Sequence, residues 1–476
     1  MYRYRAIFFT IVVICAALTA EAQYGSFGLT DARQLALGNT YASNSRELYA
    51  AGKNPSLLAW PYSEKKVSIL FPNLSARAYN VQKVTDFFNQ YFSQKPIDII
   101  TGINGALIQR ALQHQGKLYL GLQIGYFSAG FYPDKKIGAF SIAWKDYLTG
   151  YIQLPYSITE YHTGNETIKG FYFNDFKFQS SWLRAYELSW GKEFKVNPSS
   201  GISAIYTGAA VKYYSGFLYN NINISGGAGY IDENNLLVGS YHANNLSAYS
   251  DDINLKNSFN GKDVITNVPF MDPVGNGVGF DFGLAMVLVP GIKLGASITD
   301  AGLINWRGKT RQTLIAGVIK IDSSLNLETL DSLSQTITIE KETANNFRTN
   351  PPTALHLGID LMINKFIKKL PGEMNLALEL HQGVSNEMVD NPEQVRLAAG
   401  LLYKPGKWWP IALTGITNGP DGSLAWSIGI GYELPFVEFY LSSPNILPKF
   451  QNSDLQTLSI SLCWHFVKME KQKKQD

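Results

Sequence analysis

Apolar and polar residues alternate with a period of two along many segments of the chain. In residues 458–466, LSISLCWHF, every second residue from Leu458 to Phe466 is apolar, and the intervening residues are Ser459, Ser461, Cys463 and His465. The same alternation occurs in residues 280–288, 292–298, 375–381, 395–403 and 424–432. Successive side chains of a strand point to opposite faces, so each segment predicts a strand with one apolar face. Such strands suit either a soluble sandwich or an outer-membrane barrel.

The connections between these segments favour the barrel. Short turns are predicted at 133–136, 197–200, 289–291, 370–373, 405–406 and 434–435, whereas longer polar stretches cover 75–115, 154–178, 220–276, 305–352, 383–393, 418–423 and 443–455. Short turns at one end and long loops at the other are typical of outer-membrane barrels. We therefore predict an all-β fold, a transmembrane antiparallel barrel of about fourteen strands over residues 67–466. Strand-like runs within 311–341 are expected to extend the wall or to form a loop hairpin.

The two ends of the chain indicate the compartment. Arg3 and Arg5 precede an apolar run that ends in Ala20-Glu21-Ala22, the pattern of a cleavable secretory signal. We expect residues 1–22 to be a signal peptide cleaved near Ala22/Gln23, and residues 467–476 to form a basic periplasmic tail. The expected localisation is the cell outer membrane.

Composition narrows the function classes. The chain is 45% hydrophobic and 13% aromatic and contains 42 glycines, yet no apolar run after residue 22 is long enough for a membrane-spanning helix. Cleavage would leave one cysteine, Cys463, so neither a disulfide framework nor a cysteine metal cluster is expected. Without Arg3, Arg5 and Glu21, 39 basic and 37 acidic residues remain, which argues against a nucleic-acid partner.

The segment before the first strand carries the most specific motif. Residues 32–60 read ARQLALGNTYASNSRELYAAGKNPSLLAW and contain Gly38-Asn39 and the turn-forming Asn54-Pro55. The segment resembles the N-terminal part of outer-membrane barrels related to the long-chain fatty-acid transporter (FadL-like) family. The resemblance implies a hatch over residues 23–66 that lies inside or under the lumen, before a first strand that begins near Val67. The residues themselves predict a short helix at 45–51, capped by Asn44 or Ser45, which would belong to the hatch of a barrel or be an ordinary helix of a soluble domain.

A second motif, ITDAGLINW at 298–306, is similar to one of an uncharacterised branch of these barrels. The branch is also distantly similar to a barrel component of the type nine secretion system. The resemblance therefore leaves open whether the barrel transports anything.

Helical spacing occurs in the first long connection. Phe87, Phe88, Tyr91 and Phe92 share one face of an expected amphipathic helix within 82–113. These residues either pack over the barrel mouth or line an apolar binding pocket.

The polar faces of the strands supply lumen-facing candidates: Glu379, His381, Arg396 and His465. A symmetric turn at 383–393 would pair Leu380 with Val395 and set Glu379 opposite Arg396, within salt-bridge reach. The sequence contains no G-x-S-x-G, H-E-x-x-H, P-loop or dinucleotide-binding motif, so we expect no enzyme activity, no cofactor and no metal.

Two functions follow from this reading. One is a FadL-like channel for passive uptake of hydrophobic or amphipathic small molecules. The alternative is a barrel that transports nothing and serves as a structural or interaction component of a secretion or envelope assembly. The expected partners are outer-membrane lipid, a hydrophobic small-molecule ligand and envelope proteins.

Overall fold

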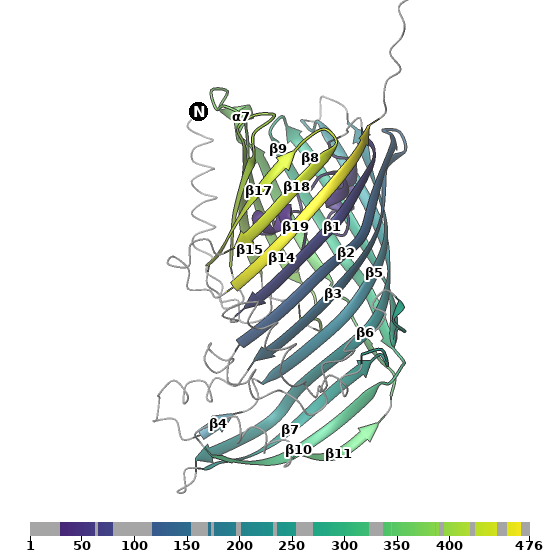
Figure 1. The fold of residues 1–476 in the computed structure, drawn as a ribbon, viewed down its shortest axis with the longest axis vertical. Helices are drawn as coiled ribbons and strands as arrows, with labels where there is room; N and C mark the ends of the chain where they lie inside the picture. The colour runs from purple at the N-terminus through teal and green to yellow at the C-terminus, as the bar shows by residue number, and fades with distance from the viewer. Residues whose placement is uncertain are drawn as a thin grey trace, which may run out of the picture.

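The computed structural model is built around one closed β-sheet (Figure 1). It describes residues 29–61, 65–79, 117–153, 170–172, 176–196, 201–231, 236–253, 270–322, 337–343, 345–385, 387–389, 395–418, 424–444 and 455–467. The expected signal peptide, residues 1–22, lies outside these ranges, as does the expected basic tail, residues 467–476, apart from Val467, which is the last residue of β19. Among the described residues, no helix is long and apolar enough to cross a membrane.

The first strand, β1 (Lys65–Tyr79), closes the sheet because it pairs with both β2 (Lys117–Asp134) and the last strand, β19 (Leu455–Val467). Fourteen antiparallel strands complete the circuit, which confirms the predicted fold class. The other eleven are β3 (Gly138–Gln153), β5 (Lys177–Lys195), β6 (Ala204–Ile231), β8 (Gly275–Val289), β9 (Ile292–Trp306), β13 (Ala354–Met362), β14 (Glu373–Gly383), β15 (Arg396–Lys404), β16 (Ile411–Asn418), β17 (Leu424–Glu433) and β18 (Val437–Pro444).

Five further strands extend the sheet at the end opposite the short turns. They are β4 (Gly170–Tyr172), β7 (Leu236–Tyr249), β10 (Arg311–Asp322), β11 (Ile337–Thr343) and β12 (Phe347–Thr349). The second half of β6 pairs with β7, which pairs with β10, so one side of the barrel is taller than the rest (Figure 1). β4, β7 and β12 lie in stretches that were predicted to be loops, so that prediction was wrong for these strands. β10 and β11 are the strand-like runs within 311–341 that were expected to extend the wall or to form a loop hairpin.

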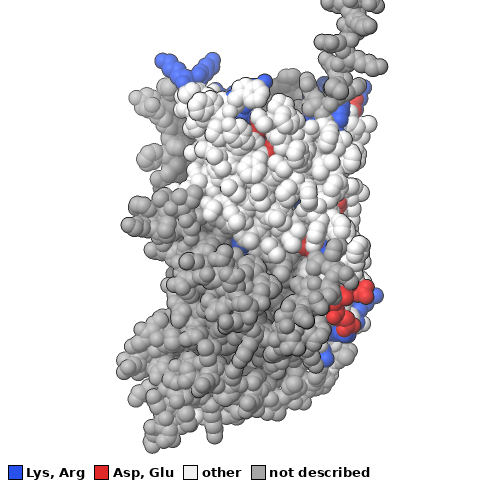
Figure 2. Space-filling view, viewed as in Figure 1, with Lys and Arg blue, Asp and Glu red and all other residues white. Residues whose placement is uncertain are grey.

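The outer surface of the barrel carries the predicted apolar faces. In β19, Leu458, Trp464 and Phe466 are exposed, whereas Ser459, Ser461, Cys463 and His465 are buried. Figure 2 shows an almost uncharged band over the strands, with Lys and Arg above it and mixed charges at its lower edge. Trp408 and Trp409 are more than half exposed beside the short turn between β15 and β16. An apolar band with rings near strand ends is what a bilayer requires.

Residues 29–61, which we call the hatch, lie inside the barrel near the end that carries the short turns and α7 (Ile363–Phe366) (Figure 1). The hatch contains α2 (Ala32–Ala36), η1 (Glu47–Ala50) and η2 (Pro55–Ala59). Ala36, Leu37 and Leu48 are almost fully buried. The expected helix at 45–51 is only the single 3-10 turn η1, whereas β1 begins at Lys65, near the expected Val67.

Candidate functional site

Two charged residues of the wall hold the backbone of the hatch. Glu379 on β14 accepts hydrogen bonds from the amides of Tyr41 and Ala42, the second at 2.7 Å. Arg396 on β15 donates to the carbonyls of Gly38 and Asn39 at 2.9 and 3.2 Å. The sequence analysis selected both side chains as lumen-facing candidates, and the structure makes them anchors of the hatch.

The register expected for these two residues was wrong. In the β14–β15 ladder His381 faces Arg396, and Glu379 faces Ala398. The pairing is therefore offset by two residues from the expected one. Glu379 and Arg396 still approach diagonally, with a carboxylate oxygen 3.9 Å from a guanidinium nitrogen. Each charge thus stabilises the other while it binds the hatch.

Glycines in the wall let the hatch approach the strand backbones. A Cβ atom added at any of eight wall glycines would lie less than 3.0 Å from a hatch atom. Several of these glycines are direct partners across neighbouring strands. Gly208, for example, pairs with Gly191 on β5 and with Gly283 on β8. The eight, which we call the glycine seat, are Gly191, Gly208, Gly283, Gly295, Gly358, Gly400, Gly415 and Gly429. The hatch is therefore packed at backbone distance against β5, β6, β8, β9, β13, β15, β16 and β17.

The hatch residues selected from the sequence shape the chain within this seat. Gly38 and Asn39 both adopt positive φ, 67° and 62°, and so reverse the chain after α2. Asn54 caps η2 by accepting from the Ser56 amide, and its side-chain nitrogen donates to the Ala42 carbonyl at 2.6 Å. Pro55 begins η2, where its missing N–H costs nothing.

A cavity of about 120 Å³ lies between the hatch and the wall. The hatch contributes Tyr41, Tyr49 and Lys53 to its lining, and β14 contributes His381. Lys53 forms an ion pair with Asp31, also on the hatch. Burial lowers the pKa of Lys53, and the neighbouring Asp31 carboxylate opposes that shift. The lining thus mixes aromatic rings with charged groups.

The motif at 298–306 builds one side of this cavity. Asp300 adopts a positive φ of 57° where the β8–β9 register shifts. Its carboxylate accepts a 2.6 Å hydrogen bond from Lys212 and a further one from the Tyr214 hydroxyl. At the end of the motif, the buried Trp306 ring packs where a Cβ on Gly216 would otherwise stand. The motif therefore places the Asp300 carboxylate beside the cavity.

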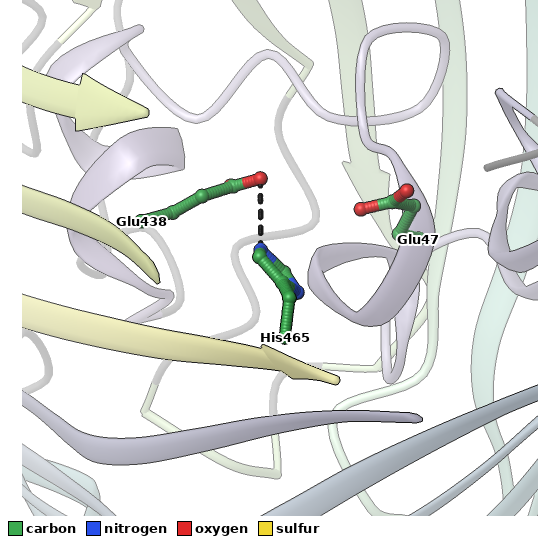
Figure 3. Close-up of side chains that lie close together, drawn as sticks. All are labelled: Glu47, Glu438 and His465. Carbon is green, nitrogen blue, oxygen red and sulfur yellow. Dashed lines mark ion pairs between the residues drawn. The ribbon is translucent and has the colours of Figure 1, made fainter. Parts of the chain in front are cut away.

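Figure 3 shows Glu47, Glu438 and His465, whose ligand atoms lie within 4.8 Å of one another. The ammonium of Lys65 lies 2.7 Å from Glu47, 3.0 Å from Glu438 and 3.2 Å from the His465 ring. A lysine ammonium thus stands where a metal ion would have to bind. The cluster is an ion-pair network that joins the hatch to β1, β18 and β19, and its residues do not fit a metal.

The expected apolar pocket residues Phe87, Phe88, Tyr91 and Phe92 lie outside the described residues. Near the cavity, His381 lies 3.0 Å from His356 between ring nitrogens, and the ring of Tyr41 packs on His356. His465 is instead part of the network with Lys65. His381 and His465, the two histidines among the lumen-facing candidates, therefore lie in different clusters, one with His356 and one with Lys65.

Sequence reasoning missed a buried ion pair on the outer face. Arg184 on β5 and Asp146 on β3 pair at 2.7 Å, and both are at most 3% exposed. Their chain neighbours line the cavity, so the alternation places this pair outside. The rings of Tyr126, Trp144 and Phe217 lie 4.9–5.5 Å from the guanidinium. The other outward-facing side chains of β5 near this position are apolar or aromatic. The arginine at position 184 was therefore the sequence signal that could have revealed the ion pair.

Fold and hatch together define an outer-membrane β-barrel whose lumen holds an N-terminal segment of the same chain. Residues 59–443 match the model of the Family of unknown function (DUF5723), and the chain belongs to this family. A search of curated proteins found no match.

Solved structures similar to the chain include FadL-like barrels. The toluene transporter TbuX of Ralstonia pickettii is 12% identical over 92% of this chain and 98% of its own, with a TM-score of 0.44. The toluene transporter TodX of P. putida is 12% identical, with coverage of 94% and 100% and a TM-score of 0.40. A Pseudomonas aeruginosa FadL homologue is 12% identical, with coverage of 93% and 100% and a TM-score of 0.38. At this identity no ligand and no residue role is carried over.

Proposed function

We propose that the protein is an outer-membrane channel for small amphipathic molecules and that the hatch gates it. One observation carries this proposal: the hatch is folded inside the barrel, and a cavity with rings and charges lies between it and the wall. A molecule in that cavity can reach the short-turn end only if the hatch moves. The short turns of outer-membrane barrels face the periplasm, so movement of the hatch would open the periplasmic side.

A disulfide between hatch and wall tests the gate. A Cβ at position 358 would lie 2.9 Å from the hydroxyl oxygen of Ser43. That proximity suits a disulfide, whose Cβ atoms lie about 3.5–4.5 Å apart. The double variant Ser43→Cys/Gly358→Cys is made in a Cys463→Ala background and reconstituted into liposomes.

Solute flux is then measured before and after reduction. We expect flux of a small amphipathic solute in the reduced protein and little flux in the oxidised one, while Gly358→Cys alone shows no redox dependence. Equal flux in both redox states would contradict gating by the hatch.

The second candidate function is a barrel with a permanent plug that serves an envelope assembly. The glycine seat favours it, because backbone-level packing against eight strands makes release of the hatch costly. Absence of flux in both redox states, with co-purification of a stoichiometric envelope protein, would support this alternative.

A further inference from the structure

The connection between β14 and β15 buries its tip, residues 387–389, inside the barrel. β14 runs away from the short turn that precedes it, so the tip belongs to the end of the barrel opposite the short turns. Met388 and Val389 are only 5% and 4% exposed, whereas Val384 in the same connection is 55% exposed. Met388 also lines the cavity between the hatch and the wall. Connections normally run over the surface in water, so two buried apolar side chains in one of them indicate a specific contact.

Val389 reaches the opposite side of the lumen. It packs in one cluster with Tyr119 on β2 and Tyr151 on β3. Around the fourteen-strand circuit, β2 lies halfway from β14 and β3 lies halfway from β15, in either direction. Alternation places both tyrosines on the same face as Gln123 and Thr149, which line the cavity. The tip therefore spans the barrel and docks on the far wall.

Met388 packs against a second part of the wall. Its cluster includes Leu183 on β5, Tyr214 on β6 and the buried Trp306 of β9. Leu183 and Tyr214 line the cavity together with Met388. A flexible thioether side chain suits an irregular space of this kind. Met388 therefore forms part of the boundary of the cavity on the side of the long connections.

Among the described residues, two hydrogen bonds also join the tip to other elements, both through Glu387. The backbone carbonyl of Glu387 accepts from the Tyr219 hydroxyl at 3.4 Å, and its carboxylate accepts from the Asn350 amide. This contact is small compared with that of the hatch, which has ion pairs to the wall and the glycine seat. Segments with few contacts open more readily than well-packed ones. The tip is therefore the closure of the cavity that opens more easily.

We infer that residues 387–389 are the outer lid of the cavity, held shut by the docking of Met388 and Val389. The inference rests on the proposed function and deepens it by naming a second gate. The long connections of outer-membrane barrels face the outside of the cell, so the lid controls entry and the hatch controls exit to the periplasm. A solute enters the cavity when both apolar side chains leave the wall.

A cysteine in the cavity tests the lid. Thr149 lies one inward-facing position from Tyr151 toward the short turns, lines the cavity and is 5% exposed. Thr149→Cys is made in a Cys463→Ala background, and its rate of modification by a soluble maleimide is followed in the folded full-length protein in detergent. Adding Met388→Ser/Val389→Ser should accelerate labelling by about tenfold or more, because burial of even one such side chain shifts an opening equilibrium by that factor.

Matched variants separate the lid from a general loosening of the barrel. Val384→Ser removes an exposed apolar side chain from the same connection and should label at the rate of the parent Thr149→Cys protein. The single variants Met388→Ser and Val389→Ser should each accelerate labelling less than the pair. Heat-modifiable mobility on a gel shows that each variant is folded.

Labelling at the parent rate in the folded double variant would overturn the inference, and so would equal acceleration by Val384→Ser. The labelling experiment leaves the hatch unchanged, so its result does not depend on whether the hatch moves. Redox-dependent flux without faster labelling would refute the lid and leave the channel intact. Faster labelling in a protein that shows no flux with a reduced hatch disulfide would refute the channel and leave the lid intact.

Discussion

Replacing Glu379 with glutamine should loosen the hatch without unfolding the barrel. Glu379 accepts from two hatch amides, and its charge offsets that of Arg396, which is itself bound to two hatch carbonyls. Glutamine keeps an acceptor of similar shape but removes the negative charge. The buried guanidinium of Arg396 then loses the Glu379 carboxylate while the hatch is seated.

The magnitude follows from that lost charge. Removing one partner of a buried ion pair costs about 3–5 kcal/mol. When the hatch is released, water reaches Arg396, so most of this cost falls on the seated state alone. At 1.4 kcal/mol per factor of ten, the ratio of released to seated hatch should rise roughly 100- to 4,000-fold.

Cysteine labelling measures this ratio. Ser43→Cys is placed on the hatch in a Cys463→Ala background, and its rate of modification by a soluble maleimide is followed in the folded protein. Ser43 is 1% exposed, so labelling requires the hatch to move. Glu379→Gln should accelerate labelling by the factor above.

The matched control is Asp281→Asn, which also neutralises a buried lumenal carboxylate. Asp281 pairs with Lys212 and accepts from the Asp300 amide, both in the wall. Its substitution should leave the labelling rate within a few-fold of the parent protein. If Glu379→Gln labels at the parent rate while the barrel stays folded, Glu379 does not anchor the hatch.

Three other outcomes are expected. Gly415→Ala should block assembly, because its Cβ would overlap the backbone of Gly38. The control Gly150→Ala should assemble normally, because a Cβ at that position would have no atom within 4 Å. Heat-modifiable mobility on a gel reports folding of both variants. Arg184→Met should lower the free energy of unfolding by about 3–5 kcal/mol, because it leaves the Asp146 carboxylate buried without its cation. The double variant Arg184→Met/Asp146→Leu should recover most of the lost stability, as measured by urea unfolding in detergent. A double variant that is less stable than the single one would contradict this prediction. Deletion of β19 should prevent insertion into outer-membrane vesicles, since β1 loses its partner; normal insertion would show that closure does not depend on this pairing.

Alternation with a period of two determined the wall. It is a local property of each strand, so residues 458–466 alone indicate which side chains face lipid. The short turns could be read from the same pattern, because a turn must keep both apolar sets on one side of the sheet. Gly38, Asn39, Asn54 and Pro55 also show their backbone roles locally, as residues that favour turns.

The tertiary structure decided what lies inside the wall. Glu379 could be placed in the lumen from alternation, but its partners are amides more than 330 positions earlier in the chain. Alternation does not report the offset of two residues in the β14–β15 register, because a shift of two keeps every side chain on its face. The sequence also does not show the glycine seat. Its glycines look like ordinary strand residues, and only the folded hatch inside the barrel brings its backbone against them. Contacts between residues far apart in sequence depend on how the whole circuit closes, and no local pattern contains that information.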